Sequence, residues 1–312
     1  MVHAPDRVAA PPLPARDRPA PNATRAREPD ATGFVDRDGV RIFYEVYGTG
    51  EPTVLLLPSW SIVHSRVWKA QIPDLARRHR VVTFDPRGNG RSDRPSTADA
   101  YAEREFAADA LAVMAATDTE RAVLVSLSRG AQRALILASD HPDRVLGAVF
   151  IAPSLPLDRP RGTPRSLVAF LAPPRTSEGW DTYNAVYWRA EYHAFIDFFF
   201  ARCFTERHST KPKEDCVGWA AETDAETLIL STVADGLVDR EDVLERAARV
   251  RCPTLVIHGR DDDVVPYVIG EEFAWATGGR LLAIDGGGHL PNARDPIKVN
   301  LAVRDFARGL RR

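Results

Sequence analysis

Three segments of the chain hold residues that could carry out nucleophilic chemistry together. Ser128 ends the apolar run VLVSLS, Asp262 lies in GRDDDVVP after the run TLVIHG, and His289 lies in DGGGHLP after RLLAID. A serine hydroxyl is a weak nucleophile and needs a base, and an imidazole oriented by a carboxylate is such a base. The residues therefore predict acyl transfer, with Ser128 as nucleophile, His289 as base and Asp262 as the orienting acid.

Each of these assignments has an alternative in the sequence. Ser128 could be an ordinary serine in a strand-to-helix turn. Asp261 and Asp263 flank Asp262, and we interpret them as solvated loop acids or as caps of the next helix. Among the remaining histidines, His258 ends a predicted strand beside the acidic loop and is the one rival to His289.

Apolar runs that alternate with helical patterns must position these residues. Strand-like runs cover residues 53–58, 80–85, 121–128, 144–153, 253–259 and 280–286, after a hairpin signal at Asp38-Gly39. Helical patterns cover residues 67–78, 106–117, 130–142, 270–277 and 299–310. Alternation of this kind predicts parallel crossovers, and open α/β sheets place their sites at the carboxyl ends of the strands. The fold class is therefore α/β, with a mostly parallel central sheet flanked by helices.

The alternation stops between about residue 154 and residue 240. This segment is helical, rich in proline and aromatic residues, and lacks a strong strand-like run. It predicts a helical cap at residues 154–240, inserted after the sixth strand into a core of residues 33–153 and 241–312. Residues 1–32 are rich in Pro, Ala and Arg with few large apolar side chains, so we expect a disordered tail.

Four motifs resemble those of one family. VLVSLSRGAQ resembles the nucleophile elbow G-x-S-x-G of α/β-hydrolases, with Ser126 in place of the first glycine. GRDDDVVP resembles the family's acid loop, G-x-x-D-x-x-x-P, and His289 matches its G-H motif after the last strand. Residues 84–95 resemble the loop D-x-R-G-x-G-x-S, whose Asp85, Arg87 and Ser92 we interpret as structural. With the chain order Ser, Asp, His, the chain is identified as a member of the α/β-hydrolase superfamily, similar to its capped serine esterases and lipases.

The chain departs from this family after the strand TVLLL. The family usually has His-Gly there, and this chain has Pro58-Ser59-Trp60. By position, the resemblance places the two oxyanion-hole donors at the backbone N–H groups of Trp60 and Arg129. The hydroxyls of Ser59 and Ser61 are further candidate donors.

Arg129 is unusual directly after a nucleophile, because a cation at a helix N-terminus is disfavoured by the helix dipole. Either it forms a salt bridge with a carboxylate in the cap, or it meets an anionic group of the substrate. Aromatic residues of the cap are expected mainly to pack, with a few lining the pocket. The candidate substrate-binding residues are Arg129, Trp60, Trp180, Tyr187 and Trp188.

Composition narrows the class of protein. The 312 residues are 44% hydrophobic with a formal net charge of -2, so no basic surface argues for nucleic acid. No stretch reaches the roughly 18 apolar residues of a membrane span. Three cysteines without metal-like spacing predict free thiols in a reducing cytoplasm, with a disulfide between Cys203 and Cys216 across a loop as the alternative. Neither a metal nor a cofactor is expected. The oligomeric state is left open.

The predicted function is a serine hydrolase that cleaves a carboxylic ester or a related acyl bond of a small molecule, such as a thioester or lactone. The same triad would serve a hydrolase of C–C bonds or a cofactor-free perhydrolase or haloperoxidase. A serine nucleophile argues against dehalogenase and epoxide hydrolase chemistry. A ligand-binding regulatory protein with weak turnover is the alternative from another class, because a fold alone does not fix function.

Overall fold

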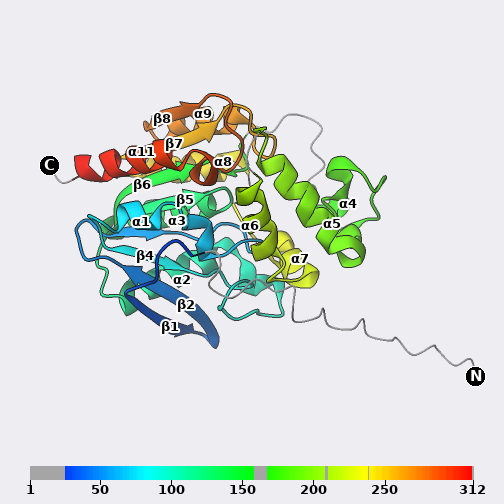
Figure 1. The fold of residues 1–312 in the computed structure, drawn as a ribbon, viewed down its shortest axis with the longest axis horizontal. Helices are drawn as coiled ribbons and strands as arrows, with labels where there is room; N and C mark the ends of the chain where they lie inside the picture. The colour runs from blue at the N-terminus through cyan, green and yellow to red at the C-terminus, as the bar shows by residue number, and fades with distance from the viewer. Residues whose placement is uncertain (1–24, 158–166, 208–209, 238, 311–312) are drawn as a thin grey trace, which may run out of the picture.

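An eight-stranded sheet forms the centre of the computed structural model, which describes residues 25–157, 167–207, 210–237 and 239–310 (Figure 1). The strand order is β1-β2-β4-β3-β5-β6-β7-β8, with β2 antiparallel to β1 and β4 and the other neighbours parallel. The strands are β1 (Ala31–Arg37), β2 (Val40–Tyr47), β3 (Val54–Leu56), β4 (Val81–Phe84), β5 (Ala122–Leu127), β6 (Val145–Ile151), β7 (Thr254–Gly259) and β8 (Arg280–Ile284). The predicted α/β fold class is confirmed.

Helices cover both faces of this sheet because successive strand residues point to opposite sides. In β3, Val54 and Leu56 belong to one apolar cluster, while Leu55 belongs to the other. One face is covered by α2 (Glu103–Ala116), α3 (Gly130–Asp140), α8 (Arg240–Arg249) and α9 (Tyr267–Ala276). The other is covered by α1 (Ile72–Leu75) and α11 (Pro296–Gly309), with α10 (Pro291–Arg294) beside α11. Among the helices in the described ranges, none is both long and apolar enough to cross a membrane.

Of the five α-helices described between β6 and β7, all but α8 lie beyond the carboxyl ends of the strands (Figure 1). We call them the helical insertion: α4 (Leu167–Leu171), α5 (Ala185–Cys203), α6 (Lys211–Ala220) and α7 (Ala225–Val233). Trp60, just past β3, joins the insertion to the core, because its indole donates to Ser231 Oγ at 3.1 Å and its ring packs on Trp188. The division into core and cap at residues 154 and 240 stays a prediction.

The segment predicted as one helix over residues 67–78 is different in the structure. It forms a 3₁₀ helix at Ser65–Trp68 and the single-turn helix α1. Pro73 explains the interruption, since it has no N–H for the bond to residue 69 and its ring clashes with that carbonyl.

The predicted tail ends earlier than residue 32. Arg25 forms an ion pair with the buried carboxylate of Glu45, and the Gly48 N–H donates to Asp30 Oδ2 at 2.6 Å. Ala31 and Thr32 already pair with β2. A composition with few large apolar residues predicted disorder here, but Arg25 and Asp30 have specific hydrogen-bond partners in the folded chain. Residues 1–24 lie outside the described residues.

Candidate active site

Ser128 stands at the sharp turn between β5 and α3. Its backbone has a φ of 53°, in the left-handed region that non-glycine residues seldom adopt. Such a conformation costs about 1–3 kcal/mol and persists only where neighbours hold it. Here the Ser128 N–H donates to Ile151 O at 2.9 Å, and the Ser154 N–H donates to Ser128 O at 3.0 Å. The end of β6 therefore fixes the strained turn.

His289 lies between Ser128 and Asp262. Its Nε2 is 2.9 Å from Ser128 Oγ, and its Nδ1 is 2.8 Å from Asp262 Oδ2. The imidazole is buried, whereas Ser128 is partly exposed. The three residues predicted from separate strand ends thus form a hydrogen-bonded series in which His289 bridges Ser128 and Asp262.

The carboxylate of Asp262 is held in its ionised form. Burial alone would raise its pKa, but the positive charge that His289 carries when it is protonated, with hydrogen bonds from His258 and His289, holds the pKa well below its usual range. An ionised carboxylate can only accept hydrogen bonds. His289 therefore carries its proton on Nδ1, which leaves Nε2 free to accept the proton of the Ser128 hydroxyl.

His258 is a second donor to this carboxylate and does not replace His289. Its Nε2 lies 3.0 Å from Asp262 Oδ2 and its ring is fully buried. Its Nδ1 is buried and has no partner within the described ranges, so Nε2 is the ring nitrogen that donates to Asp262. The neighbours of Asp262 have other roles, because Asp261 is exposed and Asp263 forms an ion pair with Arg202 at 3.0 Å.

Close backbone contacts bring the loop of His289 to the acid strand. A Cβ on Gly259 would lie 2.1 Å from Gly287 O, so only glycine allows this approach. The His289 N–H donates to Cys203 O at 3.0 Å, and the Gly288 N–H donates to Glu206 Oε1 at 3.0 Å. The loop is therefore anchored by the end of α5, a contact that the sequence did not predict.

The loop of Pro58, Ser59 and Trp60 lies directly against the nucleophile turn. A Cβ on Gly130 would meet Pro58 O at 2.6 Å, so the two backbones are in contact. In the part of the chain that the structure describes, neither the Trp60 N–H nor the Arg129 N–H has a hydrogen-bond acceptor. Two free amide donors are thus present beside Ser128.

A buried ion cluster supports this loop and was missed by sequence reasoning. Arg133 donates to Glu103 through Nε at 3.0 Å and through Nη2 at 3.2 Å, and its Nη1 donates to Ser59 O at 3.0 Å. Arg129 Nε donates to the same Glu103 at 2.7 Å. The partner of Arg129 therefore belongs to α2 in the core, and the prediction of a carboxylate in the cap is wrong. The spacing of Arg129 and Arg133, one helical turn apart, was the available signal.

Several other candidate polar groups are structural. The Ser61 hydroxyl donates to Arg87 O at 3.0 Å and is not directed at a substrate. The Arg87 guanidinium pairs with Asp109 at 2.6 Å, and Asp85 accepts from Ser65 Oγ at 2.6 Å. Ser92 Oγ donates to Asp85 O at 2.8 Å. These contacts agree with the structural interpretation of Asp85, Arg87 and Ser92.

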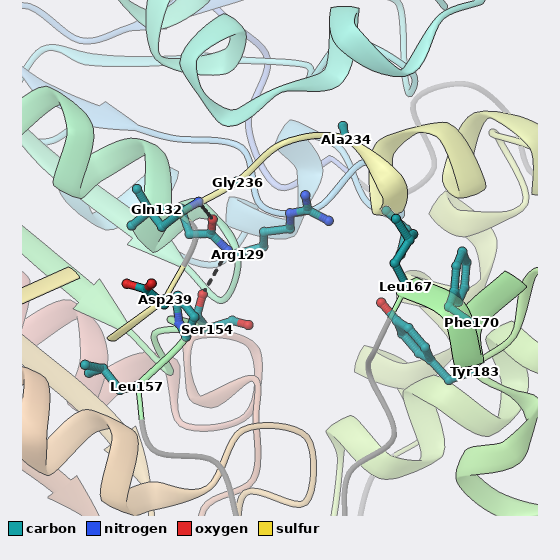
Figure 2. Close-up of a pocket in the computed structure, with 13 residues that line it drawn as sticks. Arg129, Gln132, Ser154, Leu157, Leu167, Phe170, Tyr183, Ala234, Gly236 and Asp239 are labelled. Atoms are coloured by element: carbon teal, nitrogen blue, oxygen red, sulfur yellow. Dashed lines mark hydrogen bonds between the residues drawn. The ribbon is translucent and has the colours of Figure 1, made fainter. Parts of the chain in front are cut away.

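A cavity of about 550 Å³ lies between the core and the helical insertion (Figure 2). Arg129, the residue after Ser128, lines it, whereas Ser128 and His289 do not. Arg129, Gln132 and Ser154 line it from the core, and Leu167, Phe170 and Tyr183 line it from the insertion. The predicted lining residues Trp60, Trp180, Tyr187 and Trp188 are not among those that form it. They pack in the aromatic core instead, where Trp188 is fully buried, because the insertion needs an apolar interior of its own.

Comparison with known proteins identifies a family model that matches this chain and several similar proteins. A family model described as "alpha/beta hydrolase fold" matches residues 52–296. A Variovorax paradoxus protein named "Putative carbamate hydrolase RutD" is 27% identical over 269 residues, covering 85% of this chain and 95% of that protein. A Synechocystis protein named "Putative non-heme chloroperoxidase" is 30% identical over 278 residues, with 86% and 95% covered. The crystal structure of bromoperoxidase from Bacillus anthracis matches with a TM-score of 0.74 at 24% identity, covering 89% of this chain and 100% of that chain.

Proposed function

We propose that this chain is a serine hydrolase of carboxylic esters or related acyl bonds. The chain belongs to the α/β-hydrolase fold family and is an enzyme of that family. The observation that carries this proposal is the continuous hydrogen-bonded series from Ser128 Oγ through His289 to Asp262, at 2.9 and 2.8 Å. Thioesters and lactones are included, because they present the same electrophilic carbonyl carbon.

The proposed reaction has two steps. In the first, His289 Nε2 takes the Ser128 proton while the oxygen attacks the carbonyl carbon, and the protonated imidazole then delivers that proton to the leaving group. In the second, water attacks the acyl-enzyme with His289 again as base, and the acid product leaves. Asp262, held ionised, stabilises the positive charge on His289 in both steps.

The Trp60 and Arg129 N–H groups are the proposed oxyanion donors. The carbonyl and N–H of one peptide unit point in opposite directions. Arg133 holds the carbonyl of Ser59, and this fixes the direction of the Trp60 N–H on the far side of the same peptide. The oxyanion loop therefore depends on a buried cation in place of the glycine that the family usually has there.

The test is covalent labelling together with turnover. A fluorophosphonate should add to Ser128, as found by peptide mass spectrometry, and p-nitrophenyl butyrate should be hydrolysed. Ser128→Ala should abolish both, whereas Ser139→Ala should retain both, because that hydroxyl lies at the far end of α3 and bonds to Ile136 O. A folded wild-type protein that is neither labelled nor active on any acyl ester would refute the proposal and favour a ligand-binding role.

A second candidate function is cofactor-free perhydrolase or haloperoxidase activity. The relative at 30% identity, named as a chloroperoxidase, favours it. The same serine would pass its acyl group to hydrogen peroxide in place of water. Peroxide-dependent bromination of monochlorodimedone in acetate buffer, lost in Ser128→Ala, is the measurement that separates this activity from ester hydrolysis.

A further inference from the structure

The guanidinium of Arg129 is only partly hydrogen-bonded to other described residues. Its Nε donates to Glu103 at 2.7 Å, but neither Nη has a hydrogen-bond partner among the described residues. The side chain is 17% exposed, and in Figure 2 it extends from the core into the cavity, toward the side on which Leu167 lies. A guanidinium whose two Nη groups have no partner in the described ranges therefore faces this cavity, one residue along the chain from Ser128.

The charge of Arg129 is not cancelled by its partner. Glu103 is buried and accepts from two guanidiniums, those of Arg129 and Arg133, so two positive charges share one negative charge. In the Arg133 guanidinium, by contrast, each of the three nitrogens donates, since Nε and Nη2 donate to Glu103 and Nη1 donates to Ser59 O. The excess positive charge is thus presented by Arg129 to the cavity.

Among the residues that the structure describes, the acidic groups near the cavity do not bind the Nη groups of Arg129. Asp239 lines the cavity, but it is exposed and its Oδ1 accepts from the Asp242 N–H at 3.0 Å as the cap of α8. Asp235 is exposed and faces Arg104 at 3.7 Å. The amide of Gln132 is also occupied, by Ser154 O and the Leu237 N–H.

We propose that the Nη groups of Arg129 bind a carboxylate of the substrate, so that the site prefers acidic esters or lactones to neutral ones. The planar fork of a guanidinium matches the two oxygens of a carboxylate, and Glu103 holds the fork in one orientation before the substrate arrives. The apolar side chains of Leu157, Leu167 and Phe170 would contact the hydrocarbon part of the same substrate. This inference rests on the function proposed above and specifies its substrate class.

Two matched ester pairs test the proposal. The first pair is p-nitrophenyl hydrogen adipate and p-nitrophenyl hexanoate, and the acidic member has its carboxylate on the acyl side. 4-Carboxyphenyl butyrate against 4-carbamoylphenyl butyrate places it on the leaving group. The readout is the ratio of kcat/KM for the acidic ester to that for its neutral partner, because a general effect on the oxyanion hole divides out of this ratio.

The wild type should prefer the acidic member of at least one pair. A charge-assisted hydrogen bond implies that Arg129→Met lowers this preference by about tenfold to hundredfold, with Arg129→Lys between the two. Arg104→Met is the matched control, because it removes an exposed cation on α2 that does not line the cavity, and it should keep the wild-type ratio.

The outcomes separate this inference from the proposed function. If neutral esters are hydrolysed but neither pair shows an acidic preference, or Arg129→Met leaves the preference unchanged, the inference is wrong and the hydrolase proposal stands. If no ester is hydrolysed and Ser128 is not labelled, the hydrolase proposal fails. In that case calorimetry compares the binding of adipate with that of adipamide. The anion site is absent if adipate does not bind to the wild type. It is supported if Arg129→Met abolishes the binding of adipate and Arg104→Met does not.

Discussion

Arg133 offers a direct test of how the oxyanion loop is held. Replacing it with lysine keeps a positive charge near Glu103 but removes the fork that reaches both this carboxylate and Ser59 O at 3.0 Å. The peptide between Ser59 and Trp60 would then be free to rotate away from Ser128. We expect Arg133→Lys to lower kcat with little change in KM, because the oxyanion forms only in the transition state.

The size of this effect has an upper limit. Complete loss of one oxyanion donor costs about 10²–10³ in kcat. The loop is also restrained by its contact with Gly130, so we expect a loss of roughly tenfold to hundredfold, within that limit. Stability should fall by about 1–3 kcal/mol for the hydrogen bonds lost, which a typical domain of about 5–15 kcal/mol tolerates.

The assay combines steady-state turnover of p-nitrophenyl butyrate with inhibition by a boronic acid, whose tetrahedral adduct places an oxygen in the same hole. The inhibition constant should rise by about the same factor as kcat/KM falls. Arg144→Lys is the control, because Arg144 also donates to backbone carbonyls, of Glu120 and Thr119, but away from the site. A folded Arg133→Lys enzyme with wild-type kcat and wild-type boronate inhibition would refute the reasoning.

Three further predictions concern the same site. Asp262→Asn should lower kcat by on the order of 10³–10⁴, because an amide can also donate to Nδ1, which favours the wrong tautomer, and carries no charge to stabilise the protonated imidazole. Asp263→Asn should leave kcat within about threefold. Since folding lowers the pKa of the Asp262 carboxyl, its stabilising effect is present above the unfolded value of about 4 and is lost as the pH falls through the folded value. The gap in unfolding free energy between wild type and Asp262→Asn, from urea titrations, should therefore shrink below about pH 4, and a gap that widens there would contradict this sign. Gly130→Ala should lower kcat at least about tenfold, because the added methyl group would displace Pro58. The control is Gly218→Ala in α6, where a Cβ would meet open space. This variant should keep full activity, and its free energy of unfolding, from thermal unfolding, should rise by about 0.5–1 kcal/mol.

Local patterns predicted the fold well, because strand runs and the hairpin turn are encoded by neighbours in sequence. The turn at Asp38 and Gly39 has positive φ at both residues, as this dipeptide favours. The failure at residues 67–78 has a local cause as well, since Pro73 stands inside an otherwise helical pattern.

The candidate site was predicted only as far as its motifs extend. Ser128, Asp262 and His289 follow strand ends that the sheet must bring together, so their meeting could be inferred. The partners of Arg129 could not be inferred, because Glu103 approaches from 26 residues away and no local pattern encodes that distance. Likewise, the packing of Trp188 depends on how the insertion folds on itself.

The shared carboxylate of Glu103 has a consequence for anyone who wishes to re-engineer this enzyme. Its two carboxylate oxygens accept from Arg129, whose side chain faces the cavity, and from Arg133, which also donates to the Ser59 carbonyl of the proposed oxyanion loop. If both proposals hold, substrate preference and kcat depend on this one carboxylate, so we expect substitutions of Arg129 alone to change both. Varying Arg129, Glu103 and Arg133 together is the rational unit for altering this protein.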